Sequence, residues 1–360
     1  MASETVREAG AGGDGRIAGR LSVDPAGDAA TRPFGRLEEL LAFLRVGQLP
    51  RFARRALGRP VARSEDFAPP LSPAEAARLA EIAALVRGPS PRPAIFIHGV
   101  LPRSGTNFLA DALALHPDVH LNPGRLWEYP LLYVAPGSMA LQHEFLSMYR
   151  PNGEVMVRYE LLGYLASAWL VALQHEAGAR HMLFKSPHVQ GIGLFRHLFP
   201  NDILLLCLRD GRDVIQSSLK TFGRWSPLSK GFAQLAWEWR HGTEAILTFE
   251  SAGPNAHPRA VVVRYEALVE RPNETMGAVM AHAGLDPARY DFAALSGLPV
   301  RGSSAIETAA DERWLPQHRP ERFEPVGRWR AGWTAGAKCR FKAIAGATLV
   351  RAGYAADQDW

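Results

Sequence analysis

The sequence contains few cysteines and no long apolar run. Two cysteines in 360 residues cannot form a disulfide framework, so Cys207 and Cys339 are expected to be reduced thiols. No apolar run reaches the ~18 residues that a membrane-spanning helix needs. The first residues include Glu4, Glu8 and Asp14 and lack the apolar core of a secretory signal. We therefore expect a cytoplasmic protein.

Patterns for metal and nucleic-acid binding are also missing. No CxxC pair occurs and the twelve His residues are scattered, so no metal site is predicted. The net charge is +5, but no helix-turn-helix, zinc or aromatic ribonucleoprotein pattern accompanies it. Nucleic acid is therefore not an expected partner.

Length and composition predict one large domain with an N-terminal extension. A chain of 360 residues that is 47% hydrophobic can bury a large core. Residues 1–35 are rich in Gly, Ala and charge, which predicts a disordered tail. Residues 36–90 are predicted to form a basic helical extension, and residues 91–360 the main domain. A capping box at Ser72 and Glu75 predicts a helix through Val86.

Positive charge is concentrated in residues 36–63, which hold seven Arg and two Glu. Leu and Phe are interleaved with the Arg residues. One interpretation is an amphipathic element that docks on an anionic membrane or a partner. The simpler interpretation, which we favour, is an arm packed on the domain with its Arg side chains in solvent.

A strand, a small-residue loop and a helix are predicted at residues 93–113. The run PAIFIHGV is typical of a buried strand, and the loop LPRSGTN follows it. The first amides of a helix have no internal partner and lie at its positive end, so they can bind an anion. Gly105 permits close approach, and Arg103 adds a positive charge. The pattern predicts a phosphate-binding loop.

This loop differs from the Walker loop GxxxxGK[ST]. Gly99 and Gly105 are one residue too far apart. The Walker Lys position after Gly105 is Thr106, and the position of the Ser/Thr that would bind magnesium is Asn107. An ATP-dependent P-loop kinase is therefore the less favoured alternative. A non-catalytic nucleotide-binding module is another alternative, but the basic residues Arg103, Lys185 and Arg209 are all retained.

A second strand and helix follow at residues 203–218. The apolar run ILLLCL predicts a strand buried on both faces, and a helix is expected to begin near Arg212. Arg209 at the strand end and Ser217 two turns into the helix can then converge on one anion. Alternating strands and helices predict an α/β fold, with a parallel sheet covered by helices on both faces. Its ligand is expected beyond the carboxyl ends of the strands.

These two motifs resemble those of sulfotransferases, which use 3′-phosphoadenosine 5′-phosphosulfate (PAPS) and release the bisphosphate PAP. Family loops read PKSGTTWL or PRSGTTLL, and a family Arg eight residues before a Ser binds the 3′-phosphate. The resemblance covers residues 94–334 and is strongest to a bacterial subgroup related to protein-tyrosine sulfotransferases. It implies a P-loop-like three-layer sandwich. It also implies PAPS-binding roles for Arg103, Ser104, Gly105, Thr106, Asn107, Phe108, Arg209 and Ser217.

Further segments match later pieces of the same family. Lys185 in LFKSPH stands where a family Lys contacts the transferring group, and Tyr265 in RYEAL where a family Tyr contacts adenine. Arg322, with the Gly327-Arg328-Trp329 turn, resembles an element that closes over the 3′-phosphate. The family's Lys-Gly after that Arg is Phe323-Glu324 here, so the match is secure only for Arg322.

The resemblance also implies the chemistry, a metal-independent in-line transfer to a hydroxyl or amine. Arg103, Lys185 and loop amides would neutralise charge on the leaving phosphate. Two residues are candidates for the base that deprotonates the acceptor. They are Glu128, slightly favoured, and His188; the alternatives are a first-turn helix carboxylate for Glu128 and a cap for His188 on a helix that begins at 189. The acceptor class, a small-molecule, glycan or lipid hydroxyl, stays open.

Overall fold

A computed structural model describes residues 71–88, 91–153, 155–222, 230–300, 317–318 and 323–360. Its centre is a five-stranded sheet in the order β2-β3-β1-β4-β5, and every neighbouring pair is parallel. The strands are β1 (Ile95–Gly99), β2 (Val119–Leu121), β3 (His181–Ser186), β4 (Ile203–Leu208) and β5 (Ala260–Arg264). The segments 1–35 and 36–63 and the residue Arg322 lie outside the described residues.

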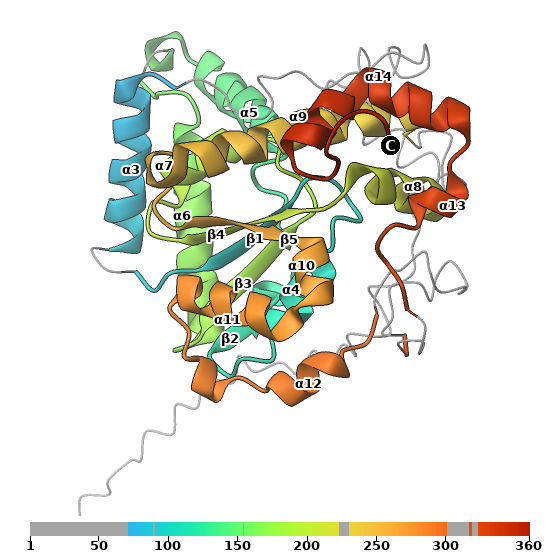
Figure 1. The fold of residues 1–360 in the computed structure, drawn as a ribbon. Helices are drawn as coiled ribbons and strands as arrows, with labels where there is room; N and C mark the ends of the chain where they lie inside the picture. Colours follow the sequence, from blue (N-terminus) through green and yellow to red (C-terminus); the bar gives the residue numbers. More distant parts are fainter. Residues whose placement is uncertain (1–70, 89–90, 154, 223–229, 301–316, 319–322) are drawn as a thin grey trace, which may run out of the picture.

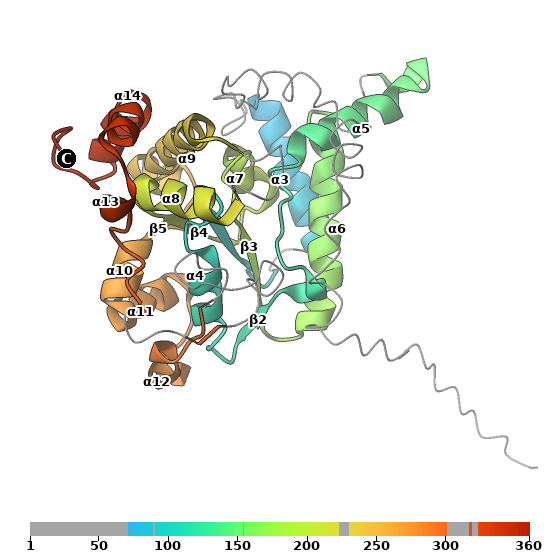
Figure 2. The same ribbon diagram turned by 90° about the vertical axis from the view of Figure 1, so that its right-hand side faces the viewer.

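Helices cover both faces of this sheet (Figures 1 and 2). The described helices are α3 (Pro73–Arg87), α4 (Thr106–Leu113), α5 (Ala135–Ser147), α6 (Glu160–Ala177), α7 (Phe195–Leu198), α8 (Gly211–Phe222), α9 (Phe232–Ala252), α10 (Tyr265–Glu270), α11 (Pro272–Ala283), α12 (Phe292–Ser296), α13 (Trp329–Gly332) and α14 (Ala335–Arg351). One face packs against α6, α7, α8 and α9, with α3 outside α6 and α14 outside α9. The other packs against α4, α10 and α11. The predicted three-layer α/β fold is confirmed.

The sheet order places three functional segments side by side. β1 lies between β3 and β4, with Ile97 aligned with Lys185 on one side and with Leu205 on the other. The carboxyl ends of parallel strands share one edge of a sheet. The loop after β1 therefore lies between Lys185, near the end of β3, and Arg209, which directly follows β4.

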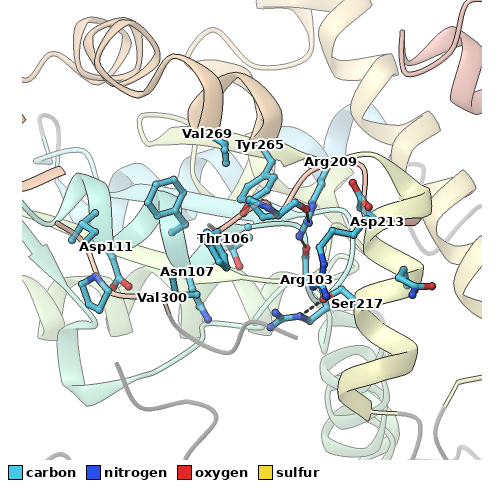
Figure 3. Close-up of a pocket in the computed structure, with 18 residues that line it drawn as sticks. Arg103, Thr106, Asn107, Asp111, Arg209, Asp213, Ser217, Tyr265, Val269 and Val300 are labelled. Carbon is cyan, nitrogen blue, oxygen red and sulfur yellow. Dashed lines mark hydrogen bonds between the residues drawn. The ribbon is translucent and has the colours of Figure 1, made fainter. Parts of the chain in front are cut away.

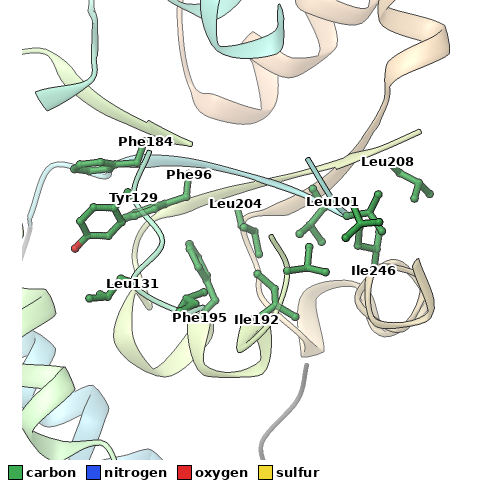
Figure 4. Close-up of a cluster of buried hydrophobic side chains, with 14 of the residues drawn as sticks. Phe96, Leu101, Tyr129, Leu131, Phe184, Ile192, Phe195, Leu204, Leu208 and Ile246 are labelled. Carbon is green, nitrogen blue, oxygen red and sulfur yellow. The ribbon is translucent and has the colours of Figure 1, made fainter. Parts of the chain in front are cut away.

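An aromatic cluster fixes the loop that precedes α5 (Figure 4). The Phe96 ring lies 5.1 Å from Phe184 and 5.3 Å from Phe195, and the Tyr129 ring lies 4.6 Å from Phe184. The Tyr129 N–H also donates to the Lys185 carbonyl over 2.8 Å. Packing and a backbone bond thus hold residues 127–129 against the end of β3.

Several element boundaries match the sequence, and one does not. The capping box at Ser72 and Glu75 is present at the start of α3, and α8 begins one residue before Arg212. No helix begins at 189: a short 3-10 turn at Ile192–Leu194 leads into α7. Gly191 ends the preceding loop in the left-handed conformation, where a side chain would lie 2.4 Å from the Leu132 carbonyl. A left-handed residue cannot lie inside a right-handed helix, so the helical turns begin after Gly191.

Candidate functional site

A pocket lies beyond the carboxyl ends of β1 and β4, where the sequence placed the ligand (Figure 3). Residues from the β1–α4 loop, α8, α10 and the C-terminal segment face each other across it. Its lining includes Arg103, Gly105, Thr106, Asn107, Phe108, Asp111, Arg209, Asp213, Gln216, Ser217, Tyr265, Val269, Leu298, Pro299, Val300, Phe323, Pro325 and Arg328.

The loop after β1 directs helix amides toward this pocket. The first helical bond of α4 runs from the Leu109 N–H to the Gly105 carbonyl over 3.1 Å, so the amides just before it have no acceptor within the helix. Arg103 has a φ of 81° and Gly105 a φ of 98°, which reverse the chain over a short distance. A non-glycine residue in this region is strained, as is common in ligand-binding loops.

Of residues 103–108, to which the resemblance assigned PAPS-binding roles, Ser104 is the one that does not line the pocket. It is fully buried. Its amide and its hydroxyl both donate to the Leu101 carbonyl, over 3.1 Å and 2.7 Å, and the hydroxyl also accepts from the Leu101 N–H. Ser104 therefore holds the loop's shape, and its groups are already used inside the loop.

Two features require a glycine at position 105: its left-handed backbone and the nearby Tyr265 ring. A Cβ at this position would lie 2.2 Å from the Tyr265 ring, which lines the same pocket. We expect Gly105→Ala to displace Tyr265 and distort the loop. Affinity for PAP, the ligand that the sequence resemblance implies, is expected to fall by about tenfold or more, because a left-handed φ adds ~1–2 kcal/mol of strain to the clash. Calorimetry measures this. Gly277→Ala, where no atom lies within 4 Å of an added Cβ, is the control, and equal losses in both variants would contradict the account.

Arg209 connects two walls of the pocket. Its side chain donates to the Arg103 carbonyl over 2.8 Å and to the Pro325 carbonyl over 2.6 Å. The guanidinium lies 4.3 Å from the centre of the Tyr265 ring. Arg209 is 7% exposed, and its Nε has no hydrogen-bond partner among the described residues. A buried, charged donor of this kind is suited to an anion.

Ser217 and Arg103 meet on the same side of this pocket. The Arg103 Nε donates to the Ser217 hydroxyl over 3.1 Å, drawn as a dashed line in Figure 3. Ser217 lies on α8, whereas Arg209 comes shortly before that helix begins. The predicted convergence of Arg209 and Ser217 on one cavity is therefore present, together with Arg103.

Asp213, which the sequence analysis did not single out, fixes the C-terminal wall. Its carboxylate accepts from the Gly327 N–H over 2.6 Å and from the Trp329 N–H over 3.0 Å. Burial raises the pKa of Asp213, while Arg209 and these two amides lower it by less. Arg328, between the two amides, lines the pocket, whereas Gly327 lies beside it. Asp213 on α8 thus holds residues 327–329 of the predicted C-terminal element at the edge of the pocket.

Removing this carboxylate is expected to loosen the wall. Asp213→Ala leaves two amides without a charged acceptor, so we expect the free energy of unfolding to fall by about 1–3 kcal/mol and cleavage of residues 323–334 by protease to increase. Asp213→Asn keeps one acceptor oxygen, so its free energy of unfolding and its cleavage rate are expected to lie between those of Asp213→Ala and the wild type. Denaturant titration and limited proteolysis measure both, and an unchanged cleavage rate in Asp213→Ala would refute this role.

A second cluster lies at the end of β3, outside the lining of that pocket. The Lys185 Nζ is 3.9 Å from the Glu128 Oε1 and 4.2 Å from the centre of the Trp127 ring. The Lys185 side chain is buried, whereas the Glu128 side chain is 39% exposed. Burial raises the pKa of the Glu128 carboxyl above its usual range, and Lys185 lowers it by less. Glu128 lies in a loop, so it is not a first-turn helix carboxylate.

His188 follows Lys185 by three residues, and its pKa is shifted in the opposite direction from that of Glu128. Its ring stacks on Tyr133 with the centroids 4.4 Å apart, and its backbone carbonyl accepts from the His98 Nδ1 over 2.8 Å. Burial, helped by the charge of Lys230, lowers the pKa of His188 to about 3. Since no helix begins at 189, His188 is not a helix cap.

Two further searches of the described residues give negative results. They contain no group of three or more His, Cys, Asp or Glu side chains arranged to hold a metal ion. Within the same residues, no helix is both long and apolar enough to cross a membrane.

Comparison with known proteins identifies the family. The sulfotransferase family model matches residues 93–289, more than half of the chain. The chain is 26% identical to protein-tyrosine sulfotransferase 2 of Gallus gallus over 272 residues, 73% of this chain and 69% of that protein. It is 29% identical to nodulation protein NoeE of Sinorhizobium fredii over 297 residues, 74% of this chain and 68% of that protein.

Among solved structures, the sulfotransferase domain from the curacin biosynthetic pathway aligns with 72% of this chain and 98% of its own, at 18% identity and a TM-score of 0.44. This superposition is loose, and the assignment depends on the sequence matches. The family model's match to more than half of the chain leads to one conclusion: the chain belongs to the sulfotransferase family.

Proposed function

We propose that this sulfotransferase takes its sulfuryl group from PAPS and transfers it, without a metal ion, to a hydroxyl or amine. The observation that carries the proposal is Arg209, a buried guanidinium that holds both pocket walls and keeps one nitrogen without a partner among the described residues. Arg103 and Arg328 line the same pocket. A ligand with more than one anionic group fits this arrangement.

Each part of PAPS has a candidate site in the pocket. The helix amides at the start of α4 and Arg103 are suited to the 5′-phosphosulfate. Arg209, Ser217 and Arg328 are suited to the 3′-phosphate, and Arg322 is proposed to join them. The Phe108 and Tyr265 rings, 6.5 Å apart and nearly perpendicular, offer apolar surfaces for adenine.

The transfer step needs positioned charges and a base. As the acceptor oxygen bonds to sulfur, the bond between sulfur and the 5′-phosphate oxygen breaks, and the acceptor proton moves to the base. The leaving phosphate gains negative charge, which Arg103, Lys185 and the loop amides would neutralise. Sulfuryl transfer, like phosphoryl transfer, needs little further covalent assistance from the protein.

The electrostatics favour Glu128 over His188 as that base. A base works best when its pKa lies near the working pH. The raised pKa of Glu128 brings its carboxylate closer to that condition, whereas a pKa of about 3 makes His188 a very weak base. We therefore assign proton removal to Glu128 and a structural part of the acceptor wall to His188.

A transfer assay tests this proposal. We expect purified protein to move label from sulfur-35 PAPS to members of a library of small-molecule, glycan, lipid and tyrosine-peptide hydroxyls, with the same rate in EDTA. Mg²⁺ and γ-labelled ATP replace PAPS in the control. Label transferred only from ATP would favour the kinase alternative, and no transfer with intact PAP binding would favour the non-catalytic module.

A further inference from the structure

Exposed apolar side chains of the described residues are concentrated in one part of the chain. Twelve large apolar residues are exposed, and all except Leu85 fall between residues 127 and 171. They lie in the loop before α5, on α5, in the α5–α6 connection and on α6. Single exposed apolar residues are common, but a concentration of this kind marks an interaction surface.

Four of these residues form a stripe along α5. Leu141 and Phe145 lie on α5, and Val134 and Met148 are the residues directly before and after it. The four are seven, four and three residues apart, which places them on one side of the helix. Their exposed fractions run from 48% to 71%. A neighbouring, buried side of the helix is fixed to the domain by Gln142, which donates to the Val157 carbonyl and accepts from the Leu161 N–H. Figure 2 shows α5 projecting beyond the sheet and its flanking helices. We call these four residues the α5 stripe.

Aromatic residues border the stripe at both ends. Tyr149 is 67% exposed directly after it, and Tyr133 is 37% exposed directly before it. Tyr and Trp are enriched at membrane surfaces, where the ring is buried and its polar tip meets water. The described part of α5 carries one carboxylate, Glu144, and Arg150 follows in the connection to α6.

The described chain begins at residue 71, and a basic segment precedes that residue in the sequence. Residues 36–63 carry a net charge of +5, and residues 64–70 can span at most ~25 Å before α3 begins. The first turn of α3 is tied to the α5–α6 connection, because Arg158 donates to Glu75 over 2.5 Å and 2.8 Å. An exposed apolar surface with positive charge tethered to it through so short a stretch of chain fits the surface of an anionic bilayer. A second copy fits less well, since two +5 segments would repel each other.

We propose that the α5 stripe and its aromatic border dock this protein on a membrane that contains anionic lipid. Apolar contact comes from the stripe, and attraction to the headgroups comes from residues 36–63. The docking does not depend on the reaction. If the proposed function holds, the stacking of Tyr133 on His188 puts the docked membrane at the acceptor side of the site.

Vesicle flotation of the full chain tests the proposal. We expect the wild type to float with phosphatidylcholine vesicles that contain phosphatidylglycerol, to float poorly with phosphatidylcholine alone, and to dissociate in high salt. The double variant Phe145→Ser/Met148→Ser is expected to bind at least about tenfold more weakly, because burial of even one such side chain is worth about that factor. The matched control is Leu85→Ser, whose side chain is 70% exposed on α3 and which is expected to bind as the wild type does.

Other outcomes identify other occupants of the stripe and would overturn the proposal. Wild type that stays unbound, or a double variant that binds normally, contradicts membrane docking. A dimer that becomes monomeric in the double variant, measured by light scattering, identifies a second copy as the occupant. A large fall in melting temperature with unchanged flotation shows that another part of the chain covers the stripe. None of these readouts requires PAPS or turnover, so they do not test the proposed function.

Discussion

Arg209→Ala is expected to weaken PAP binding by roughly ten- to a hundredfold. Each charge-assisted hydrogen bond of this kind contributes about 1.5–3 kcal/mol. The variant removes the donor proposed for the 3′-phosphate and also the bonds to the Arg103 and Pro325 carbonyls. Affinity for AMP, which lacks the 3′-phosphate, is expected to fall much less. Calorimetry with both nucleotides measures the difference.

Two controls separate phosphate binding from general damage. Arg209→Lys keeps the charge but cannot make all the bonds of a guanidinium, so an intermediate affinity is expected. Arg271→Ala removes an exposed arginine that pairs only with Glu274 in the described structure and is expected to change nothing. Equal losses of PAP and AMP affinity in Arg209→Ala would argue that Arg209 acts on the pocket's shape rather than on the 3′-phosphate.

Glu128→Gln is expected to lower turnover by about a hundredfold or more while leaving PAP affinity unchanged. General-base catalysis contributes about 10²–10⁴, and Glu128 lies outside the lining of the pocket proposed to bind the nucleotide. His188→Ala is the matched comparison, and its effect is expected to fall mainly on acceptor KM. The assignment reverses if His188→Ala abolishes turnover and Glu128→Gln stays near wild type, with both variants folded.

The pH profile of turnover gives an independent reading of the same assignment. Glu128 works as a carboxylate, so activity is expected to fall as pH drops through its pKa. Because burial raises that pKa, the acid limb is expected above the ~4.3 of an ordinary Glu. A base at His188 would instead keep its activity until about pH 3. The limb is expected to disappear from the residual activity of Glu128→Gln.

The fold, and the meeting of the β1–α4 loop, Arg209 and Ser217 around one pocket, could largely be predicted from sequence. Strands such as ILLLCL are continuously apolar because both of their faces are buried. Such an uninterrupted apolar run is easy to identify as a strand in the sequence. The loop around Gly105 and the spacing of Arg209 and Ser217 are local features. Local features of this kind determine which groups meet when two adjacent parallel strands end at the same edge.

What could not be predicted depends on contacts between distant segments. The loop at residues 187–191 ends in a left-handed glycine that lies close to the Leu132 carbonyl. The apolar pattern alone does not show this turn and predicted a longer helix than the one present. Asp213 holds the C-terminal wall through two backbone amides, and backbone amides leave no trace in a sequence pattern. The opposite pKa shifts of Glu128 and His188 come from burial, which depends on the assembled fold.

The central claim is that this pocket selects a nucleotide with phosphate groups at both the 3′ and 5′ positions, without a metal. Calorimetric titration of the wild type with PAP, AMP and ATP, each with EDTA and with Mg²⁺, tests it most directly. We expect PAP to bind at least about tenfold more tightly than AMP, since one charged phosphate contact is worth that much, and with the same affinity in EDTA. Equal affinity for PAP and AMP, or tight binding of ATP only with Mg²⁺, would contradict it.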